Sequence, residues 1–133
     1  NINLNAGQGF YWGSAVAFSM SGATIKNVTV TATFVNASTN QQVPGEGENP
    51  SWTLGAAGCG GLAVWVNNCT VENCTINLTL SGDATAAYYA GIAYDIAGST
   101  LTDVTVKCAT QLDLYKTSTP ASETNVNFEL ITA

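Results

Sequence analysis

Short stretches of the chain alternate strictly between apolar and polar residues. In residues 28–34, Val, Ala and Phe alternate with Thr, and in residues 74–80 Cys, Ile and Leu alternate with Thr and Asn. This period of two is typical of strands that turn one face to the core and the other to water. Straight-chain helix formers such as Glu, Lys and Met are scarce, and Arg is absent. The pattern therefore predicts an all-β protein.

Three segments follow one template without gaps. The template runs small residue, aliphatic, Ala, six variable positions, Thr, aliphatic, any residue, Asn or Asp, Val or Cys, Thr, aliphatic, and it fits residues 15–30, 61–76 and 91–106. Its first Thr falls at Thr24, Thr70 and Thr100, so the copies are 46 and 30 residues apart. A recurring segment indicates a repeated structural unit. We interpret the excess between the first two copies as an inserted loop at residues 40–58.

The apolar rhythm changes inside each copy of the repeat. After the aliphatic residue that follows the template's first Thr (Ile25, Val71 or Leu101), the next apolar positions come three and five residues later, whereas an unbroken strand would place them two and four later. Asn and Asp suit a bend there because they tolerate left-handed backbone angles. Each copy therefore predicts a strand, a bend and a second strand. The bends fall at Lys26 and Asn27, Glu72 and Asn73, and Thr102 and Asp103.

The middle copy resembles the GLUG-type repeats of bacterial surface proteins and adhesins. The resemblance lies in Gly60-Gly61-Leu62 and in the Asn73-Cys74 step. It implies strand-turn-strand units that stack in an extracellular β-solenoid, and it implies no catalytic residue.

The length of 133 residues suits one domain, residues 1–133. The unequal repeat spacing and the long insert favour a single sandwich or jelly-roll-like domain built from the strand-bend-strand units. A short right-handed β-solenoid is the alternative.

Charge and composition exclude several functions. The formal net charge is −6, Lys and Arg together number three, and His is absent. Such a chain lacks the cations that nucleic acid or an anionic membrane requires, and it lacks the commonest general base and metal ligand. No apolar run reaches the roughly 18 residues of a membrane-spanning helix. We expect no catalytic residue, no metal, no cofactor, no membrane insertion and no enzymatic activity.

Five Asn-x-Ser/Thr sequons indicate N-linked glycans on a secreted or cell-surface protein. The chain begins at Asn1 without an initiator Met, which fits a mature product after signal removal. At the two sequons inside the repeat, the alternative is that the Asn is only a turn residue. The acceptor positions are Asn27, Asn36, Asn68, Asn73 and Asn77.

Four cysteines, an even number, predict two disulfides formed in an oxidising compartment. Of the three connectivities, we favour Cys59 with Cys69 and Cys74 with Cys108. Buried free thiols are the alternative.

Both chain ends carry candidate subunit-interface strands. Residues 125–133 alternate Val126, Phe128 and Leu130 with polar residues, after a polar tether at residues 116–124. The arm at residues 1–9 alternates Ile2 and Leu4 with Asn. Either strand could enter the sheet of a neighbouring subunit by donor-strand complementation, and such a head-to-tail contact builds a fibre. The alternative is pairing within the same domain.

These features predict a structural subunit of an extracellular glycosylated filament or surface array, a pilus-like homopolymer of identical subunits in helical assembly. The alternative is a carbohydrate-binding adhesin module with a surface polysaccharide as partner. Aromatic residues such as Trp12, Trp52 and Trp65 would then form a sugar-stacking platform, against the simpler expectation that they pack in the core or an interface.

Overall fold

The computed structural model describes residues 2–6, 12–14, 16–34, 42–43, 52–53, 58–80 and 89–132. These residues form strands and turns and no helix, which confirms the all-β prediction. None of them forms a helix that could span a bilayer.

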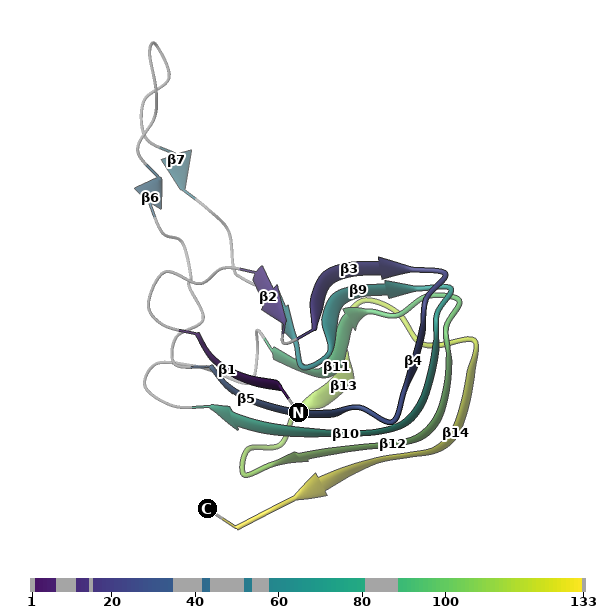
Figure 1. Cartoon of the computed structure of the whole chain (residues 1–133). Coiled ribbons are helices and arrows are strands. Elements are labelled where there is room, and N and C mark those ends of the chain that lie inside the picture. The colour runs from purple at the N-terminus through teal and green to yellow at the C-terminus, as the bar shows by residue number, and fades with distance from the viewer. Residues whose placement is uncertain are drawn as a thin grey trace.

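Most of the strands belong to two six-stranded sheets (Figure 1). The first sheet has the order β1-β5-β10-β12-β14, with β4 also paired to β10, and the second has the order β2-β8-β11-β9-β3, with β13 paired to β11. A separate antiparallel pair, β6 with β7, falls in the predicted insert. The bounds are β1 (Ile2–Ala6), β2 (Trp12–Ser14), β3 (Ala17–Ser21), β4 (Thr24–Lys26), β5 (Thr29–Phe34), β6 (Gln42–Val43), β7 (Trp52–Thr53), β8 (Gly58–Gly60), β9 (Ala63–Asn67), β10 (Thr70–Leu80), β11 (Tyr89–Asp95), β12 (Thr100–Cys108), β13 (Asp113–Tyr115) and β14 (Ser122–Leu130).

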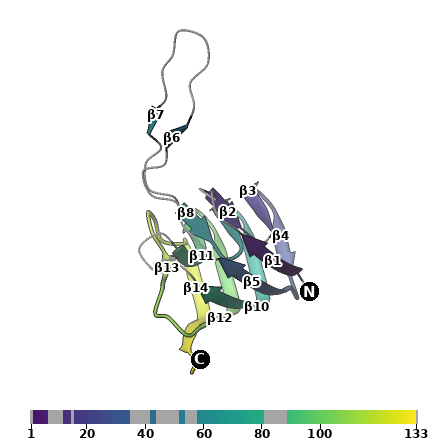
Figure 2. The same cartoon turned by 90° about the vertical axis from the view of Figure 1, so that its left-hand side faces the viewer.

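Every pair in the two large sheets is parallel, because each strand lies beside its equivalent in the next repeat. The chain therefore winds through four stacked coils: β2 to β5, β8 to β10, β11 to β12, and β13 to β14 (Figures 1 and 2). The short strand β1 lies on the outer side of β5, so β1 and β14 mark opposite ends of the first sheet.

The expected sandwich or jelly-roll architecture is not confirmed, since those folds are built from antiparallel sheets. Parallel stacked coils are instead the arrangement of a β-solenoid, the alternative. Unequal spacing argued against it, yet the extra residues fall between β5 and β8 and between β10 and β11, where they leave the pairing register intact.

The register follows the repeat template. Thr24 pairs with Thr70, Thr70 pairs with Thr100, and Thr100 pairs with Ser122 of a fourth, less regular copy. Residues that pair in this way form columns along the stack. The predicted bend is also confirmed, because Asn27, with a φ of 58°, lies between β4 and β5.

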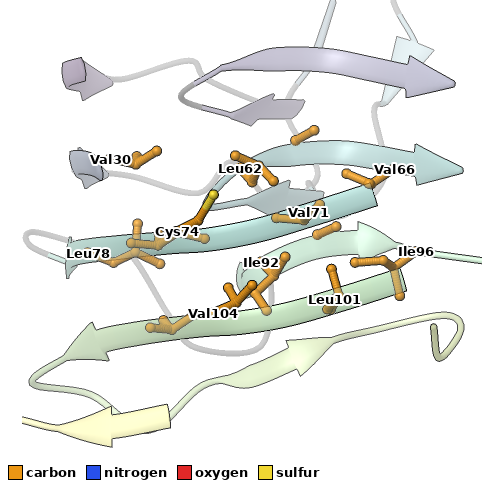
Figure 3. Close-up of a cluster of buried hydrophobic side chains, with 14 of the residues drawn as sticks. Val30, Leu62, Val66, Val71, Cys74, Leu78, Ile92, Ile96, Leu101 and Val104 are labelled. Atoms are coloured by element: carbon orange, nitrogen blue, oxygen red, sulfur yellow. The ribbon is translucent and has the colours of Figure 1, made fainter. Parts of the chain in front are cut away.

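The core lies between the two sheets (Figure 3). Its columns are continuous aliphatic rows, such as Val30, Ile76 and Val106, all fully buried. Close approach of the coils demands glycine at Gly61: a Cβ there would lie 2.2 Å from the Gly91 carbonyl oxygen. This contact explains one glycine of the Gly-Gly-Leu motif. The labelled side chains of Figure 3 are Val30, Leu62, Val66, Val71, Cys74, Leu78, Ile92, Ile96, Leu101 and Val104.

The C-terminal segments are attached to their own chain. Strand β14 pairs with β12 over eight register positions, the arrangement that had been the alternative to exchange. Residues 116–124 were expected to be a tether, but they are hydrogen-bonded to the third coil. The Lys116 and Thr117 amides donate to the Tyr94 carbonyl, and the Ser118 hydroxyl accepts from the Ile96 amide at 2.8 Å. These hydrogen bonds join neighbouring coils and so hold the segment in place.

Candidate functional site: the polar face and the two ends of the stack

The outer face of the first sheet carries columns of hydroxyl side chains. One column contains Thr29, Thr75 and Thr105, and another contains Thr24, Thr70 and Thr100. They are exposed or half-buried, as expected for the polar side of each strand. Hydroxyls repeated at the strand spacing of about 4.8 Å form a regular surface of donors and acceptors.

The bend between β4 and β5 recurs in each coil as a column of amide and carboxylate side chains, the bend column. The Asn73 side-chain nitrogen donates to Asn27 Oδ1 at 2.7 Å, and the Asn125 nitrogen donates to Asp103 Oδ1 at 2.8 Å. All four residues have φ between 51° and 58°. The bend column therefore fixes the corner by conformation and by hydrogen bonds between neighbouring coils.

The described sequons lie on different parts of this surface. Asn27 and Asn73 belong to the bend column, and Asn68 lies exposed at another corner with a φ of 54°. Asn77 lies half-buried on β10, where its side-chain nitrogen is 3.4 Å from the Val30 carbonyl oxygen to which it donates. Asn36 lies outside the described residues.

The favoured pairing of Cys74 with Cys108 is not formed. Cys69, Cys74 and Cys108 are buried free thiols. In the register, Cys74 pairs with Val104, so Cys108 lies four residues, about 13 Å, further along the neighbouring strand. A disulfide needs Cα atoms within about 7 Å. The side chain of Cys59 lies outside the described residues, and burial raises the pKa of the Cys74 thiol.

All three cations of the chain are paired with carboxylates. Lys26 Nζ lies 3.1 Å from Glu72 Oε2, Lys107 Nζ lies 3.7 Å from Glu129 Oε2, and Lys116 pairs with Asp113 at 3.1 Å. The first two pairs join neighbouring coils across the polar face, where water screens them. In the described part of the chain, no three His, Cys, Asp or Glu residues gather as metal ligands would.

The aromatic residues divide between surface and core. Trp65 on β9 is half-buried, whereas Tyr89 is fully buried and its ring packs 5.0 Å from that of Phe34. The side chains of Trp12 and Trp52 lie outside the described residues.

The C-terminal end of the stack is incompletely covered. Among the described strands, β14 has β12 as its only neighbour. Val126 and Phe128 are half-buried where the equivalent residues of inner coils are buried, and Leu130 is 59% exposed. The three predicted C-terminal interface residues thus form one apolar row on a sheet edge. At the other end, Ile2 and Leu4 of β1 pair with Val30 and Ala32.

Two positions with distinctive polar contacts were not singled out by sequence reasoning. Glu123 pairs with Leu101 and so stands in a column that is otherwise aliphatic, and it accepts a hydrogen bond from the Tyr115 hydroxyl. Burial and this carboxylate raise the pKa of Tyr115. Ser99 is buried at a corner, where its hydroxyl donates to the Val66 carbonyl and accepts from the Cys69 amide. A polar residue in an aliphatic column is the signal that would have revealed Glu123.

Comparison of the chain with protein-family models, with curated proteins and with solved structures found no match.

Proposed function

We propose that the protein is a structural subunit of an extracellular filament or surface array, and that subunits join through the terminal strand β14. The observation that carries this proposal is the outer edge of β14, which no other described strand covers and along which the apolar row Val126, Phe128 and Leu130 is half-exposed. An unpaired strand edge is a template for another strand, and burial of an exposed apolar row by a partner is energetically favourable.

The rest of the molecule supports a structural role. The described cations are all in ion pairs, and the polar face carries columns of Thr side chains. The resemblance of the middle repeat to GLUG-type surface repeats favours an extracellular location. Glycans would project from the polar face. Asn27, Asn68 and Asn73 are exposed acceptors. The side-chain nitrogen of Asn73 also donates to Asn27, and that of half-buried Asn77 donates to the Val30 carbonyl, so a glycan on either would disturb a hydrogen bond between coils.

The proposal is tested by substituting the most exposed apolar residue of the edge. In Leu130→Lys, the fold should persist because the side chain is 59% exposed, but end-to-end association should be lost because a charge enters the joint. Thr110→Lys, also at an exposed position, is the matched control. Electron microscopy and sedimentation of the full chain should show filaments or linear oligomers for the parent and the control. Monomeric parent protein at all concentrations would overturn the proposal.

A second function, binding of a surface polysaccharide, is favoured by the threonine columns. Hydroxyls of Thr29, Thr75 and Thr105 repeat along the stack and match a ligand that itself presents repeated hydroxyls. Binding to a glycan array by monomeric protein, lost in Thr75→Val but kept in Leu130→Lys, would support this function.

A further inference from the structure

Strand β1 occupies, within its own chain, the position of a strand from a preceding coil. The register links Ile2, Val30, Ile76, Val106 and Phe128 in one column, so Ile2 and Phe128 mark its two ends. In the same way Leu4 and Leu130 mark the ends of the next apolar column. The sequence Ile-Asn-Leu of β1 thus stands in phase with Phe-Glu-Leu of β14.

β1 covers only half of the edge of the first coil. It pairs with β5, whereas β4 has only β10 as a partner among the described strands. Strand β14 is longer and spans both halves, with its own bend at Asn125, where φ is 52°. On the first coil of a second copy, residues 122–124 of β14 would match β4, and residues 127–130 would match β5. Asn125 would then lie beside Asn27 and extend the bend column.

Charge disfavours contact between two C-terminal ends. Residues 109–133 have three carboxylates and one Lys, a net charge of −2, so two such ends repel one another at low salt. The first coil adds no such repulsion, because Lys26 is the only charged residue in residues 1–34 and is paired with Glu72.

One residue opposes this contact. In the register, Glu123 would come opposite Ile25, a nearly buried core residue. Removing that carboxylate from water carries a free-energy cost. An inward-facing charge of this kind is a known protection of strand edges against uncontrolled pairing.

We infer that β1 is a displaceable latch: it occupies the site on β5 that accepts β14 of a second copy, and assembly proceeds as β14 replaces it. This inference rests on the proposed function. It adds that the acceptor is the edge of β4 and β5, and that the chain regulates its own assembly through β1.

Cysteine pairs on the polar face test this register. Thr29→Cys chains mixed with Asn127→Cys chains should form disulfide-linked dimers on oxidation, because displacement brings these positions opposite one another. Within one chain the two positions are three strands, about 14 Å, apart, so they cannot bridge internally. A mixture of Thr29→Cys with Thr105→Cys, which lies on an inner strand, is the matched control. The parent protein, oxidised in the same way, shows whether the native thiols form dimers by themselves.

Two further measurements separate the outcomes. Deletion of residues 1–6 should speed assembly several-fold, because the acceptor edge is then free. If Asn3→Cys cross-links with Glu129→Cys and the first pair does not, or if assembly slows after the deletion, then β14 stacks on β1. That result would overturn the inference that β1 is displaced, but it would leave the proposed function standing. Absence of assembly in every variant would overturn both.

Discussion

Among the described residues, four of the five non-glycine residues with positive φ occupy one bend in successive coils. They are the bend column, Asn27, Asn73, Asp103 and Asn125. Asn accepts this backbone conformation more readily than other L residues, and its amide bonds to the coil beside it. The Asn side chain therefore both permits the left-handed backbone conformation and binds neighbouring coils to each other.

Asn73→Ala should lower the free energy of unfolding by about 1 to 2 kcal/mol, since Ala is strained at this φ and cannot donate to Asn27. Asn73→Gly keeps the conformation open and should lose less. Urea unfolding followed by circular dichroism measures both variants. Equal losses in Ala and Gly would show that backbone conformation contributes little here.

Ser99 bridges the second and third coils from inside the core. Ser99→Ala should lower the free energy of unfolding by about 2 kcal/mol, because the Cys69 amide and the Val66 carbonyl each lose a buried hydrogen bond. Ser118→Ala, which removes a half-buried bond to the Ile96 amide, should lose less. The comparison uses the same urea titration. A smaller loss for Ser99→Ala than for Ser118→Ala would contradict this account.

At the scale of elements, strand and bend positions followed from the sequence, because the change from period two and the Asn or Asp beside it are local signals. The fourth coil could not be predicted from the sequence in this way. There Tyr115 replaces the template Ala, and Glu123 replaces the aliphatic residue after the Thr position, so only Leu114, Asn125 and Val126 keep the pattern. Among the described coils the fourth has one neighbour, and a coil with one neighbour is under fewer of the constraints that keep inner copies alike.

Coil spacing depends on glycine at the start of the second repeat. A Cβ at Gly61 would lie 2.2 Å from the Gly91 carbonyl oxygen and 2.8 Å from Ile76 Cγ2, so Gly61→Ala should lower the free energy of unfolding by about 3 kcal/mol. Gly22→Ala is the control: it has open space but a φ of 63°, and about 1 kcal/mol is expected. Thermal and urea unfolding compare the two. A smaller loss at Gly61 than at Gly22 would contradict the close approach.

For the whole molecule, the sheet order could not be read from alternation alone, since period two suits parallel and antiparallel strands alike. The register was available: Thr24, Thr70 and Thr100 were aligned in the sequence and are paired in the sheet. The disulfide prediction failed for a different reason, because the alignment of the repeats already placed Cys74 beside Val104. Cys74 and Cys108 do lie on neighbouring strands, but the register separates them by four positions.

Tyr115 in the fourth coil should make the free energy of unfolding depend on pH in the alkaline range. In the folded protein, burial and the Glu123 carboxylate keep the Tyr115 hydroxyl protonated above its ordinary pKa of about 10. The unfolded chain binds fewer protons above that pH, so stability should fall as pH rises beyond about 10. Tyr115→Phe removes this component. Unfolding in urea at pH 9 and 11 should show a smaller drop for the variant, and an equal drop would contradict the assignment.

All variation in repeat length falls in the connections that lead from the first sheet to the second. The connections between β5 and β8, between β10 and β11, and between β12 and β13 differ in length, whereas the two corners leading into β10 and β12 stay short. Foreign peptides could therefore be inserted in these connections without a change in the pairing of the strands. In an assembled fibre they would recur at regular intervals, with a density set by the number of coils.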